Sequence, residues 1–143
     1  MQTIPMYLID TNVISEARKR EKADGGVMNF FAKARADGNA LFVSVITIGE
    51  IRRGIELIRR RGDGPQARRL EVWLGLILRD FDERVLEFAH EEAQVWGRLR
   101  VPRHANAIDK QIAATALTRD LILVTRNLAH FKDLGLQLFN PFE

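Results

Sequence analysis

The feature that most constrains the fold is an alternation of short apolar runs with longer segments whose apolar residues recur every three or four positions. Runs of four to eight apolar residues are typical of buried β-strands, and we predict strands at 6–10, 40–44, 84–88, 121–125 and 136–139. The helical period lies between these runs and predicts helices over 27–38, 45–61, 65–80, 90–100 and 108–120. This order predicts a parallel sheet that helices cover on both faces.

Two of the predicted helices form a pair separated only by a break at 62–65. The first has an apolar stripe of Ile48, Ile51, Ile55 and Ile58, which recur at three and four positions. Pro65 is expected to open the second. We expect the second helix to turn five side chains inward, namely Leu70, Trp73, Leu74, Ile77 and Leu78.

The length of 143 residues suits one domain, which we assign to 1–143. The chain has no cysteine, which excludes disulfide scaffolds and thiolate metal sites and fits a reducing cytoplasm. No apolar run approaches the roughly 20 residues that cross a bilayer, and the start of the chain has no secretory signal pattern. We therefore expect a cytoplasmic protein without a membrane anchor.

The net charge of +3 is concentrated in one part of the chain. Residues 52–69 hold seven arginines against Glu56 and Asp63. A concentrated basic segment suits a polyanion such as a nucleic acid. The alternatives are an ordinary solvated helix face and a surface that binds an acidic segment of a partner protein.

Four polar residues are predicted to face one edge of the sheet. Asp10 ends the first strand, Glu50 lies in the first turns of the helix after the second strand, Asp109 opens the helix at 108–120, and Asn127 follows the strand at 121–125. Ligands of parallel α/β sheets gather beyond the C-terminal ends of the strands. Each residue also has a local explanation: Asp10, Asp109 and Asn127 could cap turns or helices, and Glu50 could pair with a neighbouring arginine.

Several carboxylates brought together would point to a specific chemistry. Like charges a few ångströms apart repel and raise one another's pKa. Mg²⁺ or Mn²⁺ removes that cost, prefers oxygen ligands, and leaves room for a phosphate and an attacking water. Sites of this kind hydrolyse phosphodiesters.

Other chemistries find little support in the sequence. The three histidines, His90, His104 and His130, lack zinc-like spacing. There is no glycine-rich phosphate loop and no serine in a nucleophile elbow.

Four blocks carry a resemblance that covers nearly the whole chain: "LIDTNVIS", "VSVITIGEIRRGI", "AIDKQIAATA" and "LVTRN". In this order the sequence resembles the PIN-domain ribonucleases and, within them, the VapC-type toxins of type II toxin–antitoxin systems, close to the FitB-like branch. The ending "LQLFNPFE" is similar to the closing strand and tail of that family. One position departs from the pattern, because many relatives have Asp where this chain has Asn127.

The resemblance implies a three-layer α/β/α PIN domain with a central, mainly parallel sheet of four to five strands. It implies an endoribonuclease that needs Mg²⁺ or Mn²⁺ and hydrolyses RNA. The implied catalytic residues are Asp10, Glu50, Asp109 and Asn127, of which the three acids would bind the metal. The implied pocket residues are Thr11, Asn12, Thr125 and Arg126.

The resemblance also implies partners: a cognate VapB-type antitoxin, a second copy of the chain in a homodimer, and promoter DNA bound only through the antitoxin. A different class of function stays open, namely a catalytically silent PIN-like module that binds RNA or a partner. The neutral side chain of Asn127 is its main support, whereas retention of the three acids argues against it.

Overall fold

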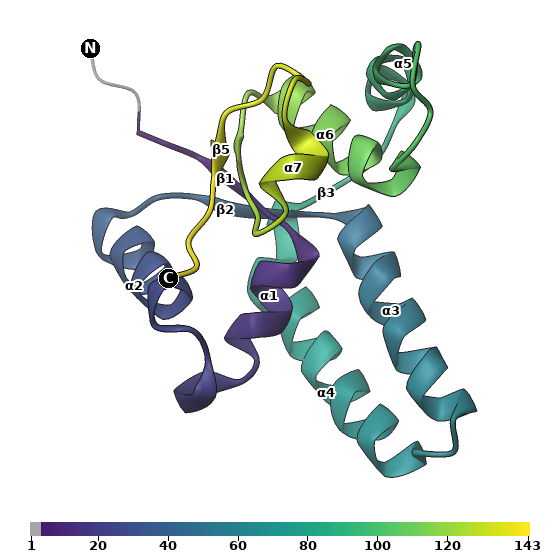
Figure 1. Cartoon of the computed structure of the whole chain (residues 1–143). Helices are drawn as coiled ribbons and strands as arrows, with labels where there is room; N and C mark the ends of the chain where they lie inside the picture. The colour runs from purple at the N-terminus through teal and green to yellow at the C-terminus, as the bar shows by residue number, and fades with distance from the viewer. Residues whose placement is uncertain (1–3) are drawn as a thin grey trace.

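The computed structural model describes residues 4–143, so the first three residues of the predicted domain 1–143 lie outside the described part. The strands of this part are β1 (Tyr7–Ile9), β2 (Leu41–Ser44), β3 (Val85–Leu86), β4 (Ile122–Val124) and β5 (Leu138–Phe139). Its helices are α1 (Thr11–Ala17), α2 (Gly25–Asp37), α3 (Val45–Arg60), α4 (Gly64–Phe81), α5 (His90–Leu99), α6 (Ala107–Arg119) and α7 (Leu128–Phe131). Two short 3₁₀ turns, η1 (Arg20–Lys22) and η2 (Asp82–Arg84), complete the chain (Figure 1).

The strands form one open sheet in the order β3-β2-β1-β4-β5. Every neighbouring pair is parallel. Each strand is only two to four residues long. The predicted parallel sheet is confirmed with all five of its strands.

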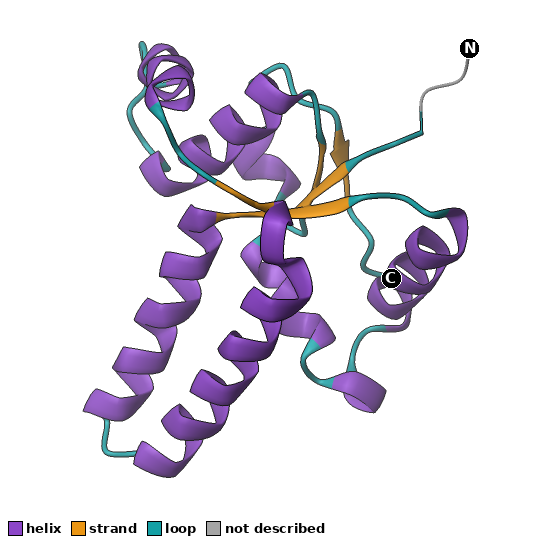
Figure 2. Cartoon of the chain, turned by 180° about the vertical axis from the view of Figure 1, so that it is seen from behind, coloured by secondary structure: helices purple, strands orange, loops and turns teal. Residues whose placement is uncertain are grey.

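Helices cover both faces of this sheet (Figure 2). Because side chains alternate along a strand, Ile9 packs with α1, α2, α3 and α4, whereas Leu8 packs with α6 and α7. Val124 and Leu123 divide in the same way on β4. The predicted three-layer α/β/α architecture is therefore confirmed.

Capping residues define the end of α2 and the starts of α3 and α4. Gly38 ends α2 in the left-handed region at φ 70°, where glycine carries no Cβ penalty. The Ser44 hydroxyl accepts a hydrogen bond from the Ile46 N–H at 3.0 Å and so starts α3. Asp63 caps α4, and Pro65 lies in its first turn. Both of the boundaries predicted at Gly38 and Pro65 are confirmed.

Helices α3 and α4 form a hairpin that projects from the sheet (Figures 1 and 2). Ion pairs join the two helices along one side. Arg52 Nη1 lies 3.0 Å from Glu71 Oε2 and 3.1 Å from Glu56 Oε2, and Arg59 pairs with the same two glutamates. Two of the arginines in the basic segment are thus held by carboxylates of the hairpin itself.

The structure corrects several details of the sequence reading. Helices α1 and α7 were not among the predicted helices. Leu78 was expected inward but is 42% exposed, whereas the other four predicted side chains, Leu70, Trp73, Leu74 and Ile77, pack in the core. Asp109 does not cap α6, since Asn106 holds that position and Asp109 lies in the first turn. No helix within residues 4–143 is long and apolar enough to span a membrane.

Candidate functional site

The site lies where the strand order reverses. From β1 the chain continues to β2 on one side, whereas β4 pairs with β1 on the other side. The ends of β1 and β4 therefore form the switch point at which open α/β sheets bind ligands. Asp10 and Thr125 follow these two strands, and the Asp10 N–H donates to the Val124 carbonyl at 2.9 Å.

Asp10 is a buried carboxylate that three donors hold in place. Its side chain is 3% exposed. Oδ1 accepts from the Thr11 N–H at 2.8 Å, and Oδ2 accepts from Thr125 Oγ1 at 2.8 Å and from Asn12 Nδ2 at 3.2 Å. Asp10 also caps α1, which was the local role that the sequence offered as an alternative. The bond from Thr125 joins segments 115 residues apart, so the carboxylate also ties two strand ends together.

The turn after β4 is fastened to the start of α1 by further hydrogen bonds. Asn12 Oδ1 accepts from the Arg126 N–H at 3.1 Å, and Thr125 Oγ1 accepts from the Asn127 N–H at 3.0 Å. Asn12 and Thr125 thus lie beside Asp10, as predicted. Asn127 contacts these residues only through its backbone N–H, which donates to Thr125, and its side chain does not cap α7.

Burial sets the electrostatics of Asp10. Loss of hydration raises the pKa of its carboxyl above the usual range, since burial disfavours the charged form. Hydrogen bonds from Thr125, Thr11 and Asn12 lower the pKa and partly offset this effect. The negative charge of Asp109 raises it further, so these two acids lie close enough to repel each other.

Asp109 has a partner that the sequence reading did not identify. His130 Nδ1 of α7 lies 2.8 Å from Asp109 Oδ2 of α6. The His130 side chain is 47% exposed and that of Asp109 is 24% exposed, so the pair lies at the surface of the site. His130 follows Asn127 by three residues, about one helical turn. This spacing from a predicted site residue was the one feature of the sequence that could have indicated that His130 lies near the site.

Glu50 lies in the second turn of α3, whose start adjoins the end of β2. None of the hydrogen bonds or ion pairs found within residues 4–143 involves its side chain. Nor do any three histidine or acidic side chains of the described residues lie close enough together to bind one metal ion. The structure therefore groups Asp10 with Asp109, and the predicted convergence of all three acids is not seen in the arrangement described.

The donor set at Asp10 fits a hard divalent cation. Carboxylates supply the oxygen ligands that Mg²⁺ and Mn²⁺ prefer, and Mg²⁺ needs only one or two of them beside its waters. The hydroxyl oxygen of Thr11 is buried beside Asp10 and finds no hydrogen-bond partner in the described part of the chain. A buried polar atom without a partner is costly, so the Thr11 hydroxyl is available to hydrogen-bond a water or another ligand of an ion at Asp10.

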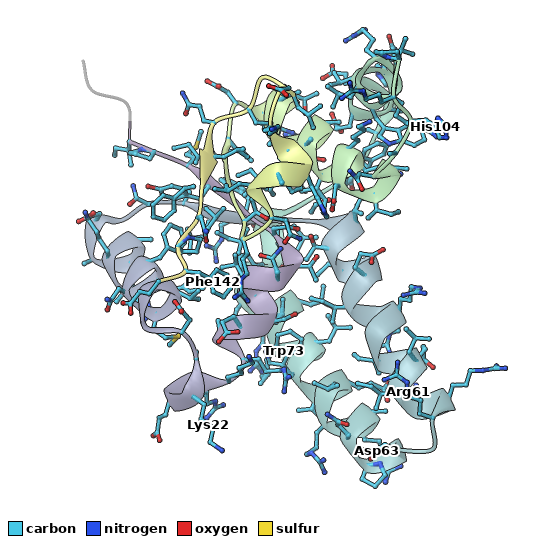
Figure 3. The ribbon with its side chains drawn as sticks, in the orientation of Figure 1. Lys22, Arg61, Asp63, Trp73, His104 and Phe142 are labelled. Atoms are coloured by element: carbon cyan, nitrogen blue, oxygen red, sulfur yellow. The ribbon has the colours of Figure 1, made fainter. Side chains whose placement is uncertain are left out.

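Arg126 lies beside the site and stacks on an aromatic ring. Its guanidinium carbon lies 4.6 Å from the centroid of the Phe142 ring, in the range of a cation–π contact. Phe142 packs against the core cluster that includes Val13 and Ile14 of α1 (Figure 3). The Glu143 N–H donates to Asp24 Oδ1 at 3.1 Å and fastens the tail to the start of α2.

An open groove of about 630 Å³ lies on the side of α4 that faces α1 and α2. Its floor is apolar and includes Phe31, Trp73 and Leu76. Its lining also contains four arginines and one acid, namely Arg18, Arg20, Arg35, Arg84 and Asp80. The groove therefore combines apolar contact area with an excess of positive charge.

Comparison with known proteins places these features in a family. The PIN domain model matches residues 7–135. The chain is 33% identical to the plasmid stability protein StbB of Pseudomonas syringae pv. tomato, over 96% of this chain and 99% of that protein. It is 29% identical to the VapC ribonuclease Y4jK of Sinorhizobium fredii, with the same coverage of each. The crystal structure of FitAcB from Neisseria gonorrhoeae contains a chain that superposes with a TM-score of 0.80 at 30% identity, covering 95% of this chain and 98% of that one.

Proposed function

This chain belongs to the PIN-domain family, in its VapC branch close to FitB, and from that premise we propose that it is the toxin of a type II toxin–antitoxin pair. We propose that it acts as an endoribonuclease that requires Mg²⁺ or Mn²⁺. The observation that carries this proposal is the buried carboxylate of Asp10 at the switch point, hydrogen-bonded to Thr125 and repelled by Asp109.

The proposed direct metal ligands are Asp10 and Asp109, and Glu50 would act through a water held by the metal. A divalent cation, when bound, would polarise the phosphoryl group and help water to ionise. Three hydrogen bonds hold Asp10 in one orientation, so little conformational freedom is lost on binding. Glu50 makes no competing contact within the described residues, and we assign it the removal of a proton from the attacking water.

The remaining site residues position the substrate. Thr11, Asn12 and Thr125 shape the pocket around Asp10. The guanidinium of Arg126, stacked on Phe142, has its N–H groups available for a phosphate oxygen. Asn127 is neutral, so its amide would orient the scissile phosphate rather than neutralise a cation.

We assign the groove between α1, α2 and α4 to the antitoxin. The solved neighbours include toxin–antitoxin complexes, such as FitAB bound to a DNA fragment, whose matching chain is 28% identical to this one. The apolar floor formed by Phe31, Trp73 and Leu76 suits apolar side chains of a partner segment, and the arginines of the lining suit flanking carboxylates. In this proposal the antitoxin is of the VapB type and supplies the contact with promoter DNA, and the toxin forms a homodimer in the cytoplasm.

The proposal is tested by incubating purified, antitoxin-free protein with total cellular RNA, with and without Mn²⁺, and mapping the cut ends. We expect cleavage that requires the ion, stops with EDTA and is lost in Asp10→Asn. Asn keeps most of the shape of Asp, so circular dichroism should show an unchanged fold. RNA that stays intact in the presence of Mn²⁺, although the protein binds it with or without the ion, would instead support the catalytically silent module and refute the nuclease.

A further inference from the structure

The hairpin of α3 and α4 carries the basic segment away from the sheet. Arg61 and Asp63 lie at its free end (Figure 3). Residues 52–69 hold seven arginines, but these arginines do not form one surface. Two of them, Arg68 and Arg69, lie on α4. The other five lie on α3 or at its end, and their positions around that helix separate them into two flanks with different surroundings.

The flank that faces α4 is neutralised. Arg52 and Arg59 pair with Glu56 of their own helix and with Glu71 of α4. These ion pairs link the two helices at their surface and leave little charge for a partner. The charge count of the sequence alone does not reveal this pairing.

The other flank begins at Glu50. Arg53, Arg60 and Arg61 follow Glu50 by three, ten and eleven residues, which places all four side chains within about 100° around the helix axis. We call these three arginines the arginine stripe. Its members are exposed, and none forms an ion pair within the described residues. Arg60 lies about 15 Å from Glu50 along the axis, at a rise of about 1.5 Å per residue.

The surroundings of the stripe suit a polyanion better than a protein segment. None of the large hydrophobic side chains exposed in the described part of the chain lies on α3. Protein interfaces bury apolar and aromatic anchors, and such anchors lie on the α4 side, at Leu76 and Trp73. Gly54 lies beside the stripe, and a Cβ added there would meet no described atom within 4 Å, so the surface is open to a strand that passes over it.

We propose that the arginine stripe binds phosphates of the RNA strand that extends from the cleavage site, and that it guides that strand along α3 to the free end of the hairpin. Arginine suits this role because its guanidinium binds phosphate oxygens through two N–H groups. The proposal rests on the proposed ribonuclease function, since it takes Glu50 as the start of the path. It assigns the hairpin to substrate binding and the groove on the other side of α4 to the antitoxin.

The test measures binding in EDTA, so that cleavage does not enter the result. A labelled single-stranded RNA of 20 nucleotides is titrated by fluorescence anisotropy at several salt concentrations. The test variant combines Arg60→Gln with Arg61→Gln. The matched control combines Arg98→Gln with Arg119→Gln, which also removes two exposed arginines from the last turns of helices.

Each phosphate contact contributes about 0.7 to the slope of log affinity against log salt for a single strand. We expect the slope of the test variant to fall by about 1.4. Between 50 and 200 mM salt, the wild type should therefore lose affinity by a factor about 7 times larger than the variant does. The control should keep the wild-type slope. An unchanged slope in the test variant, an equal fall in both variants, or no measurable RNA binding by the wild type would overturn the proposal.

A second titration with a labelled 20-residue peptide of glutamate separates RNA from an acidic protein segment. We expect the test variant and the wild type to bind this peptide equally weakly. A variant that loses peptide binding while it keeps the RNA slope would assign the stripe to an acidic partner and overturn the proposal. If the wild type does not cleave RNA in Mn²⁺ but the slope still falls in the test variant, the ribonuclease function is refuted and the stripe remains a phosphate-binding surface.

Discussion

The hydrogen bond from Thr125 to Asp10 predicts a measurable loss of stability in Thr125→Val. Thr125 is completely buried, and valine has nearly its shape without the hydroxyl. The substitution removes the 2.8 Å bond to Asp10 Oδ2 and the 3.0 Å bond from the Asn127 N–H. A hydrogen bond to a charged group contributes about 1.5–3 kcal/mol, and one between neutral groups contributes about 0.5–1.5 kcal/mol.

The expected destabilisation of Thr125→Val is therefore about 2 to 4 kcal/mol at neutral pH. In a chain of this size, 1 kcal/mol moves the Tm by about 3 to 4 °C, so the Tm should fall by about 6 to 15 °C. Thr125→Ser is the control, because it keeps the hydroxyl and loses one methyl group. We expect it to cost only about 1 kcal/mol.

The loss of stability should also depend on pH. The Thr125 hydrogen bond lowers the pKa of Asp10, although burial keeps that pKa above its unfolded value. Without this bond the folded-state pKa rises further, and the folded state binds its proton over a wider range. Stability falls with rising pH wherever the folded state binds more protons than the unfolded state. The difference in Tm between wild type and Thr125→Val should therefore be larger at pH 8 than at pH 5.

The assay is thermal unfolding in EDTA, followed by circular dichroism at pH 5 and pH 8. EDTA removes any stabilisation by bound cations. Equal Tm values for wild type and Thr125→Val at pH 8 would refute the reasoning, since they would mean that the hydroxyl does not hold the Asp10 carboxylate. A difference that shrinks as the pH rises would contradict the assigned direction of the pKa shift.

Three further predictions concern the metal, the reaction and the partner. Asn127→Asp should tighten Mn²⁺ binding in calorimetry, because it adds a carboxylate; an unchanged affinity would remove Asn127 from the site. Asp109→Asn should abolish RNA cleavage on gels while circular dichroism stays unchanged, and a variant that still cleaves would exclude Asp109 as a ligand. Leu76→Lys should weaken binding of the cognate antitoxin at least about tenfold, or about 1.4 kcal/mol, in surface plasmon resonance. Val72→Lys, on an exposed position of α4 that does not line the groove, should bind normally, and equal losses in both would refute the groove assignment.

The sequence predicted the sheet because its strands are apolar runs separated by helices with a clear period. It did not predict α1 or α7, since seven and four residues are too short to show that period. Their positions depend on tertiary contacts, such as the hydrogen bonds that Asp10 and Asn12 make with the turn after β4. Local propensity does not contain that information.

The same limit applies to the site. Asp10 and Thr125 were placed together correctly because both follow parallel strands, whose C-terminal ends meet at one edge. The contact between Asp109 and His130 requires α7 to pack beside α6, which no local pattern predicts. The pairing of Arg59 with Glu71 likewise depends on the packing of the hairpin, so the arginine count overstated the charge available to RNA.

Asp10 also differs from the other two acids in what its removal should do to the fold. If all three acids formed one repelling cluster, as the sequence suggested, neutralising any one of them would cost little stability. The structure gives Asp10 three hydrogen bonds, so Asp10→Ala should destabilise the chain. Glu50→Ala should not, because its side chain makes no hydrogen bond or ion pair within the described residues.

The claim on which the function depends is that Asp10 and Asp109 hold one divalent cation between them. Titration with Mn²⁺, followed by electron paramagnetic resonance of the free ion, measures this directly in the wild type, Asp10→Asn and Asp109→Asn. We predict one site in the wild type and its loss in both variants. Retention of wild-type Mn²⁺ affinity in either variant would contradict the claim.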